Sequence, residues 1–257
     1  MSHRYGQSIT WSTPSAPRPF SGILTAFSYE EQAQEYLDED ESGDNRALVT
    51  SGRKAALDWD AKCTPSSTDF LNLINGAKIM VSGYSSGVIL AYNAVERYVL
   101  NTPKTISVRA THFPDIDDSG GDAAGSVTAF IPDPSGLSNL FPGSQLIYST
   151  QGLTAAAGVV HGLTIEQMLE ITEDDLAPDG TVPGATAHGY KMKISLDLLA
   201  TSDRPAIDSS LDLTGAGGVV SSNGSAGEFK VTSSGLRFAT KRGMMYRVGA
   251  IWIPAFD

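Results

Sequence analysis

The sequence predicts a mainly β (β+α) protein with two similar modules, and three observations lead to this fold class. Turn-forming residues are abundant, with 26 Gly and 13 Pro among 257 residues. Apolar and polar residues alternate along several segments, most clearly in Lys191–Asp197, as they do in half-buried strands. The stretch Gly22–Asp60 also recurs, with substitutions, as Gly158–Asp197. We therefore expect two tandem β-sandwich or β-barrel modules, each with a short flanking helix.

The repeat keeps four blocks in the same order, at a nearly constant offset of 136 to 140 residues. Segment Ile9–Thr13 precedes the first copy as Leu146–Thr150 precedes the second. Equivalent positions in the later blocks are Gly22 and Gly158, Glu30 and Glu166, Gly52 and Gly189, Lys54 and Lys191, Leu57 and Ile194, Asp60 and Asp197, Arg97 and Arg237, Val108 and Val248, and Pro114 and Pro254. The common order of the blocks, rather than sequence identity, is the basis for this interpretation.

The repeat divides the chain into a first module at residues 1–116, a connector at 117–143 and a second module at 144–257. Residues 1–20 are polar and contain several Pro residues, so we expect an arm or an edge segment there. The connector is rich in Gly, Asp and Pro and is long for a compact domain. It fits either a linker or an insertion that reaches a neighbouring subunit.

Each module is expected to begin with a hairpin. A helix is an alternative within Gly22–Asp38, because the capping-like Ser28 is followed by good helix formers. The second copy alternates more like a strand, so we prefer strands in both copies. Acidic turns at 38–45 and 173–184 contain Gly or Pro and are expected to be surface loops.

Each hairpin is followed by further predicted elements. The return strands Lys54–Ala61 and Lys191–Asp197 show the alternation of half-buried strands. Short helices are predicted at Ser66–Asn75, where Ser66 or Ser67 is the N-cap, and at about Pro205–Thr214. β-Branched and aromatic strands that end on Pro close the modules at Thr105–Pro114 and Met245–Pro254.

Composition excludes several classes of function. The net charge of −11 and the pI near 4.7 argue against proteins that bind nucleic acid by neutralising its phosphates. Cys63 is the single cysteine, so no intramolecular disulfide is possible, which suits a reducing compartment. No apolar run approaches the roughly 20 residues of a membrane span. We expect a soluble protein that is cytoplasmic when it is made.

One motif carries a possible catalytic chemistry. Residues Gly83–Gly87 match G-x-S-x-G, the nucleophile elbow of α/β-hydrolases, with Ser85 as the nucleophile. An apolar strand precedes the motif, a possible helix follows it, and three histidines (His112, His161 and His188) come later in the chain. No oxyanion-type segment precedes the motif and no repeated βα pattern is present, so we favour a Ser/Gly-rich turn between two strands.

The remaining motifs give no site. Asp115–Gly120 resembles a calcium loop, but Ser126 stands where an EF-hand has Glu. The histidines lack metal-ligand spacing, and the clusters Asp38–Glu41 and Glu173–Asp175 fit solvated turns better than acid–base pairs. The glycine clusters at 215–218 and 224–227 match no phosphate-binding motif. We therefore expect no catalytic, cofactor-binding or metal-binding residues, and no cofactor.

The pattern as a whole resembles the tail tube proteins of long-tailed bacteriophages. The segments that carry it are Gly22–Asp60, Ser66–Ala77, Thr105–Pro114, Gly158–Asp197, Gly215-Ala216 and Met245–Pro254. In that family each module is a β-sandwich or barrel with a flanking helix, and the modules form hexameric rings that stack into a hollow tube. In a variation of the family, one chain carries two tube modules.

The resemblance implies a structural virion protein rather than an enzyme. Three chains would form a ring with pseudo-sixfold symmetry, and stacked rings would form the channel through which DNA passes. The expected partners are further copies of the chain, the tape measure protein and tail-end proteins, with DNA only in transit and no membrane. The protein would be located in the virion tail after assembly in the host cytoplasm. The alternatives are a serine hydrolase that uses Ser85, or another assembly protein such as a tail terminator, a distal tail protein or a head decoration protein.

Overall fold

The computed structural model describes residues 6–12, 20–39, 41–63, 79–84, 86–116, 143, 145–149, 155–200, 203–209, 211–212, 228–239 and 243–253. These residues form strands and turns and contain no helix, so the predicted mainly β class is confirmed. The strands are β1 (Ser8–Ser12), β2 (Phe20–Glu39), β3 (Asn45–Cys63), β4 (Met80–Val81), β5 (Val88–Val99), β6 (Lys104–Phe113), β7 (Gln145–Ser149), β8 (Ala155–Glu173), β9 (Ala185–Ala200), β10 (Leu211–Asp212), β11 (Glu228–Ala239) and β12 (Gly243–Ile253).

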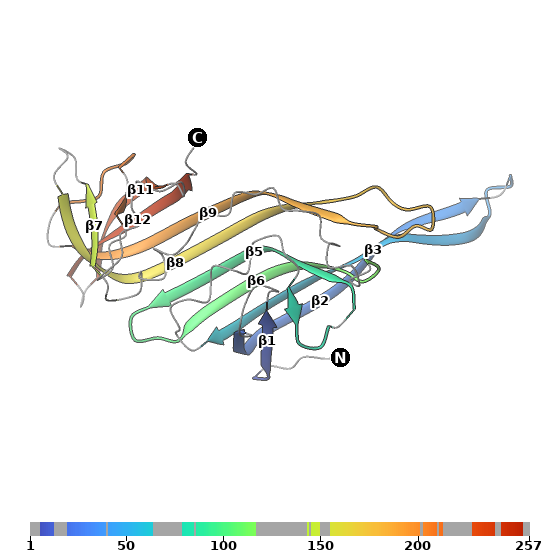
Figure 1. Cartoon of the computed structure of the whole chain (residues 1–257), viewed down its shortest axis with the longest axis horizontal. Helices are drawn as coiled ribbons and strands as arrows, with labels where there is room; N and C mark the ends of the chain where they lie inside the picture. The colour runs from blue at the N-terminus through green and yellow to red at the C-terminus, as the bar shows by residue number, and fades with distance from the viewer. Residues whose placement is uncertain are drawn as a thin grey trace.

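Eight long strands form one continuous antiparallel sheet in the order β11-β12-β9-β8-β5-β6-β3-β2 (Figure 1). The short strand β1 pairs with the start of β2, and β4 pairs with β1. The strands β1–β6 form the first half of the chain and β7–β12 the second half. In the second half, β7 pairs with the start of β8, and β10 pairs with β7. The order of pairing in the first half therefore recurs in the second half.

Irregularities in the ladders recur at equivalent positions as well. The first hairpin has one register shift, between Asp38 and Glu39, that the second hairpin lacks. The two halves share two β-bulges in the hairpin and one between the last two strands. They lie between Leu24 and Ala26, Gln32 and Gln34, and Ala91 and Asn93 in the first half, and between Val160 and Gly162, Met168 and Glu170, and Val231 and Ser233 in the second. Gly52 and Gly189, which the sequence repeat aligns, lie opposite the second bulge and have φ of 61° and 66°. Glycine adopts this left-handed conformation without the strain that a side chain would add.

Of the two predicted helices, one lies outside the described residues and the other is wrong for its described part. The helix at 66–75 lies outside the described residues, as does the connector 117–143 except Gly143. The helix at about 205–214 is wrong for its described part, which forms a turn and then β10. Asp208 has a φ of 65°, and its N–H donates to the carbonyl of Val231, as the N–H of Val231 does to Ser209. Tertiary hydrogen bonds of this kind override a weak local helix preference. The strand preferred over a helix from Ser28 is confirmed, because β2 continues to Glu39.

Over most of its area the sheet has one apolar and one polar face. At the start of β5, Val88 and Leu90 belong to a third buried cluster, on the face opposite to Ile89 and Ala91. Alternate residues of β3 and β6, such as Leu57, Trp59 and Val108, are buried in the hydrophobic core of the first half. A second core lies under β8, β9 and β12 and includes Leu163, Ile194 and Val248. The intervening residues form the opposite face, where Asp58 faces Arg109 and Asp197 faces Arg247 across neighbouring strands. This alternation places the predicted polar face of each hairpin away from the core.

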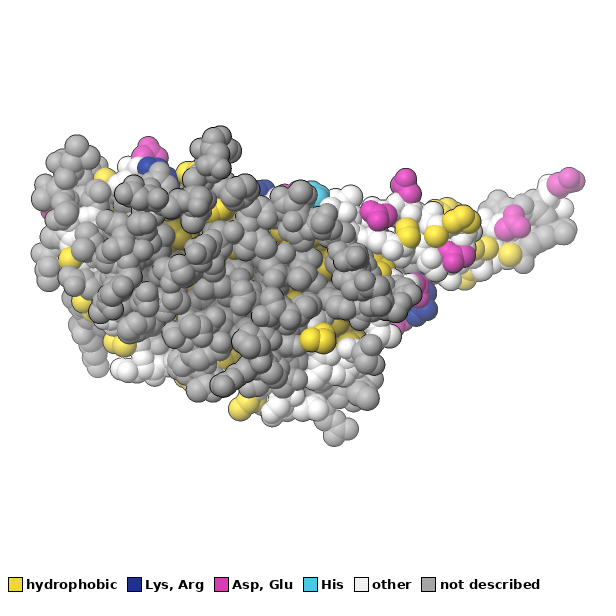
Figure 2. All heavy atoms as spheres, in the orientation of Figure 1, with side chains coloured by type: hydrophobic (Ala, Val, Ile, Leu, Met, Phe, Trp, Pro, Cys, Tyr) yellow, Lys and Arg dark blue, Asp and Glu magenta, His cyan; other side chains and the backbone are white. Residues whose placement is uncertain are grey.

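The hairpin β2–β3 extends far beyond the body of the molecule (Figure 1). Residues 30–44 contain eight Asp or Glu and no Lys or Arg. Four exposed apolar side chains face one another in pairs within this hairpin, Tyr36 with Val49 and Leu37 with Leu48. Figure 2 shows that apolar and acidic side chains are interspersed along this projection. The predicted acidic turn at 38–45 is thus the tip of this projecting hairpin.

Candidate assembly interface

The described residues of the motif Gly83–Gly87 lie between β4 and β5, and β5 is a strand where a hydrolase would have a helix. Both glycines have positive φ, 92° at Gly83 and 73° at Gly87. A Cβ atom at Gly87 would collide with the backbone of Phe113 and Pro114. Backbone geometry therefore accounts for both glycines of the motif, and Ser85 itself lies outside the described residues.

Of the three histidines, His112 lies near the motif. Its Nε2–H donates to the carbonyl oxygen of Ser86 at 2.8 Å. Its Nδ1 atom lies 3.2 Å from the hydroxyl oxygen of Tyr29. The ring also contacts Tyr84 edge-on, and Tyr29 stacks on Tyr84. His112 therefore joins β6 to the turn and to β2, and its hydrogen-bond partners among the described residues include no carboxylate of the kind found in a catalytic triad.

We expect Gly87→Ala to destabilise the protein by more than about 2 kcal/mol, because the backbone must shift to accept a Cβ at positive φ. Ser85→Ala should leave stability unchanged. Urea unfolding of both variants measures the difference. Loss of an esterase activity in Ser85→Ala, with a stable Gly87→Ala variant, would instead favour the hydrolase alternative.

Within the described residues, no group of three His, Cys, Asp or Glu side chains could hold a metal ion. Of the acidic clusters, Asp38 is exposed, and Glu173 forms an ion pair of 2.5 Å with Lys54 of the other hairpin. Asp115, at the start of the calcium-like segment, lies 3.8 Å from Arg53, and residues 117–120 are outside the described part. Cys63 is buried at the end of β3 and belongs to the core.

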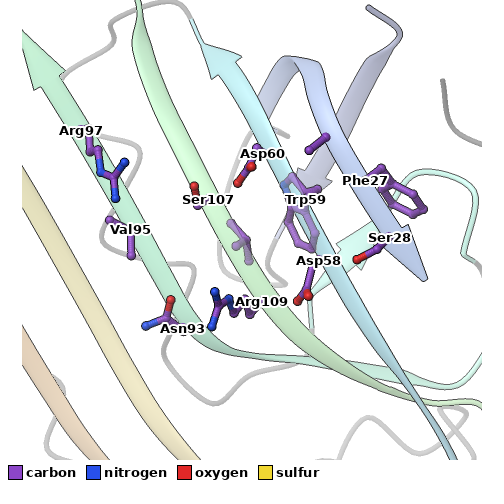
Figure 3. A pocket seen from close by; sticks show the side chains of 12 residues that line it. Phe27, Ser28, Asp58, Trp59, Asp60, Asn93, Val95, Arg97, Ser107 and Arg109 are labelled. Atoms are coloured by element: carbon purple, nitrogen blue, oxygen red, sulfur yellow. The ribbon is translucent and has the colours of Figure 1, made fainter. Parts of the chain in front are cut away.

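A hollow of about 430 Å³ lies on the polar face of the first half (Figure 3). Its charged lining comes from Asp58 and Asp60 of β3, Arg109 of β6 and Arg97 of β5. Burial raises the pKa of Asp58, Arg109 lowers it to a lesser extent, and Asp60 raises it again. In the second half, Ser195 and Gly249 take the places of Asp58 and Arg109 in the pairing register. The facing pair Asp58 and Arg109 of this hollow is therefore not repeated in the second half.

The two halves are joined by seven residue pairs between β5 and β8, from Asn93 with Met168 to Val99 with Gly162. Side chains cross this joint. Tyr98 of the first half belongs to the core of the second, and Leu169 of the second half belongs to the core of the first. The joint is thus a packed continuation of the sheet rather than a contact between independent surfaces.

A buried polar cluster lies at the joint. The Tyr98 hydroxyl donates to Glu96 at 2.9 Å, and the Lys104 ammonium lies 3.7 Å from the same carboxylate. Lys104 also lies over the Tyr98 ring, 5.3 Å from its centroid. Glu96 and Lys104 are each about 3% exposed. Such a cluster stabilises only when its charges are paired.

Within the described residues, no further strand pairs with either edge of the long sheet over the equivalent stretches 26–32 and 233–239. β2 is paired with β1 only up to Ile23, and Leu24 then bonds to residues 6 and 7. β11 bonds to the turn 208–209 at Val231, and from Ser233 onward only its β12 side is paired within the described chain. Three apolar side chains are exposed near this edge: Leu236, Phe238 and Met244. Unpaired strand edges with apolar side chains are typical of surfaces that pair with another chain.

Comparison with protein-family models and with curated proteins gives no match to this chain. Among the described residues, no helix is long and apolar enough to cross a membrane. Three structural features bear on function: the two sheet edges, the projecting hairpin, and the joint between the halves.

Proposed function

We propose that this chain is the subunit of a tail tube of a long-tailed bacteriophage, built from a tandem duplication of the tube module. Copies of the chain join edge to edge into a ring, and the rings stack into a hollow tube through which DNA passes. Three chains complete a ring of six modules. The tape measure protein and the tail-end proteins are its further partners.

One observation carries this proposal: the open edges of the chain are the equivalents of the two edges that pair inside it. β11 corresponds to β5 and β2 corresponds to β8, both by sequence offset and by shared bulges. The strand pairing that joins the two halves within one chain can therefore recur between neighbouring chains. A head-to-tail contact of this kind generates a closed ring when its rotation closes, and closure removes every exposed edge.

The polar face supports a role as the wall of a channel. Opposite charges face each other across neighbouring strands, as in Asp58 with Arg109, Glu166 with Lys193, and Asp197 with Arg247, whose Nε and Oδ1 atoms are 3.3 Å apart. The face is mixed in charge, although the chain as a whole has a net charge of −11. Because its cations lie beside carboxylates, it offers DNA phosphates no continuous basic track.

The projecting hairpin supports ring stacking. It leaves the body of the molecule along the strand direction, whereas the ring edges lie to either side (Figure 1). Its apolar pairs remain exposed in the single chain, so a second surface must cover them if they are to contribute to binding. A copy in the next ring is the partner that a tube provides.

Replacing Leu37 and Leu48 together by Thr should leave the fold intact and prevent rings from stacking. Thr keeps the β-propensity of these positions and removes the apolar contact. Electron microscopy should then show isolated rings in place of rods. Leu100→Thr, in the turn between β5 and β6, is the matched control and should still form rods. Rods of normal length from the double variant would count against the hairpin as the stacking contact.

Electron microscopy of the purified protein tests the proposed function directly, together with its native mass. Long hollow rods whose cross-section shows three chains in each ring would support it. A chain that stays monomeric at all concentrations would overturn it. Closed rings that never elongate would favour a terminator, distal tail or decoration protein, because these roles need no polymerisation into rods.

A further inference from the structure

We propose that β11 of one copy pairs antiparallel with β2 of a second copy in the register that β5 makes with β8 inside the chain. This inference rests on the proposed function, because it takes a second copy as the partner. It goes further by naming the interface residue by residue, which neither the free edges nor the resemblance provides.

The register follows from the internal template. Asn93 to Val99 face Met168 to Gly162 in the chain. The equivalent segments are Ser233–Ala239 and Gln32–Ala26, and both lie directly beyond bulges that their templates share. Because a bulge fixes the local twist and the direction of each side chain, equal bulges on both edges bring the same register into position.

This register pairs the exposed apolar side chains of one edge with aromatic rings of the other. Phe238, which is 75% exposed in the single chain, would face Phe27, and Leu236 would face Tyr29. In the template, Tyr98 faces Leu163 and is buried. Phe238 would thus enter the first core of the next copy as Tyr98 enters the second core of its own chain.

The chemistry of the two joints differs in one informative way. The positions of Glu96, Tyr98 and Lys104 are taken by Leu236, Phe238 and Met244 at the open edge. The inner joint therefore buries a paired charge cluster, whereas the edge presents an apolar trio that is exposed until a partner covers it. Apolar groups can stay exposed before assembly at far lower free energy than buried charges can stay unpaired.

Pairing of like edges is disfavoured by charge. Two copies of β2 facing each other would bring the acidic residues Glu30, Glu31 and Glu35 of both copies into one ladder. In the proposed register, Glu30 instead faces Gly235 and Glu31 faces Ser234. Charge repulsion thus disfavours the pairing of two β2 edges and is absent from the proposed contact between β11 and β2.

Disulfide trapping tests the register on the assembled protein. The tested chain carries Arg237→Cys and Ser28→Cys with Cys63→Ala, and is oxidised with diamide. Cross-strand neighbours lie within the 4.4–6.8 Å range of Cα separations that a disulfide accepts. We expect covalent trimers on a non-reducing gel. A mixture of the two single-cysteine chains should give only dimers.

Two matched variants calibrate the result. Arg97→Cys with Thr164→Cys is the internal equivalent, a pair that the template places face to face, and should form an intramolecular disulfide. Arg237→Cys with Glu30→Cys is displaced by two residues and should cross-link much more slowly. Faster cross-linking of the displaced pair, or none at the proposed pair while the internal pair oxidises, would overturn the inference.

The outcomes separate this inference from the proposed function. Covalent trimers from a protein that never forms rods would support the pairing and overturn the tube. If the chain with Arg237→Cys and Ser28→Cys forms rods but its two cysteines do not cross-link, the result would support the tube and overturn the pairing. Single-cysteine chains that dimerise with themselves would show pairing of like edges and would also overturn it.

Discussion

Replacing Phe238 by Asp is expected to abolish ring and tube formation and to leave a folded, monomeric chain. The side chain is 75% exposed in the single chain, so the fold loses little. In the proposed joint the substitution removes about 2–3 kcal/mol of apolar burial and adds a carboxylate without a partner. Each joint should weaken by more than about 100-fold. Light scattering on a size-exclusion column measures the change in mass.

Ile207→Asp is the matched control for this variant. Ile207 is 60% exposed and lies in the turn before β10. This turn bonds to β11 at Val231, outside the segment Ser233–Ala239 that forms the proposed joint. It should assemble as the unmodified chain does. Equal assembly of Phe238→Asp and the unmodified chain would mean that Phe238 is not buried in a joint.

The second large effect is expected at the buried cluster between the halves. Glu96→Ala leaves the Lys104 ammonium, 3% exposed, without its carboxylate, so we expect a loss of about 3–5 kcal/mol in the free energy of unfolding. The combined change Glu96→Leu, Tyr98→Phe and Lys104→Met installs the residues of the equivalent positions in the second half. Because it replaces the whole cluster by apolar groups, stability should be equal to or higher than that of the unmodified chain.

Urea unfolding in the Phe238→Asp background measures both variants, since assembly would otherwise add to the apparent stability. The comparison has a clear negative result. If the combined variant is as unstable as Glu96→Ala, the apolar residues of the second half cannot replace the charged cluster at the joint. The two joints would then not be equivalent in stability.

Local features of the fold could be predicted from the sequence because they depend on neighbouring residues. Alternation along Lys191–Asp197 marks a half-buried strand whichever strand lies beside it. Gly52 and Gly189 were aligned by sequence alone, and each adopts positive φ opposite a bulge. The helix predicted at about 205–214 is wrong for its described part, because local propensity is weak there. The hydrogen bonds that Asp208 and Ser209 form with the backbone of Val231 decide the conformation instead.

The sequence by itself determined that the chain is mainly β and that its pattern repeats. The tertiary structure alone decided which strands pair across long separations, since strand pairing depends on residues far apart in the chain. It placed β5 against β8, and among the described residues it gave β2 beyond Leu24 and β11 beyond Val231 no second neighbouring strand. It also showed that Phe238, unremarkable as one aromatic residue in an alternating segment, is an exposed side chain at a free edge. Exposure and edge position are properties of the assembled sheet, and no local pattern encodes them.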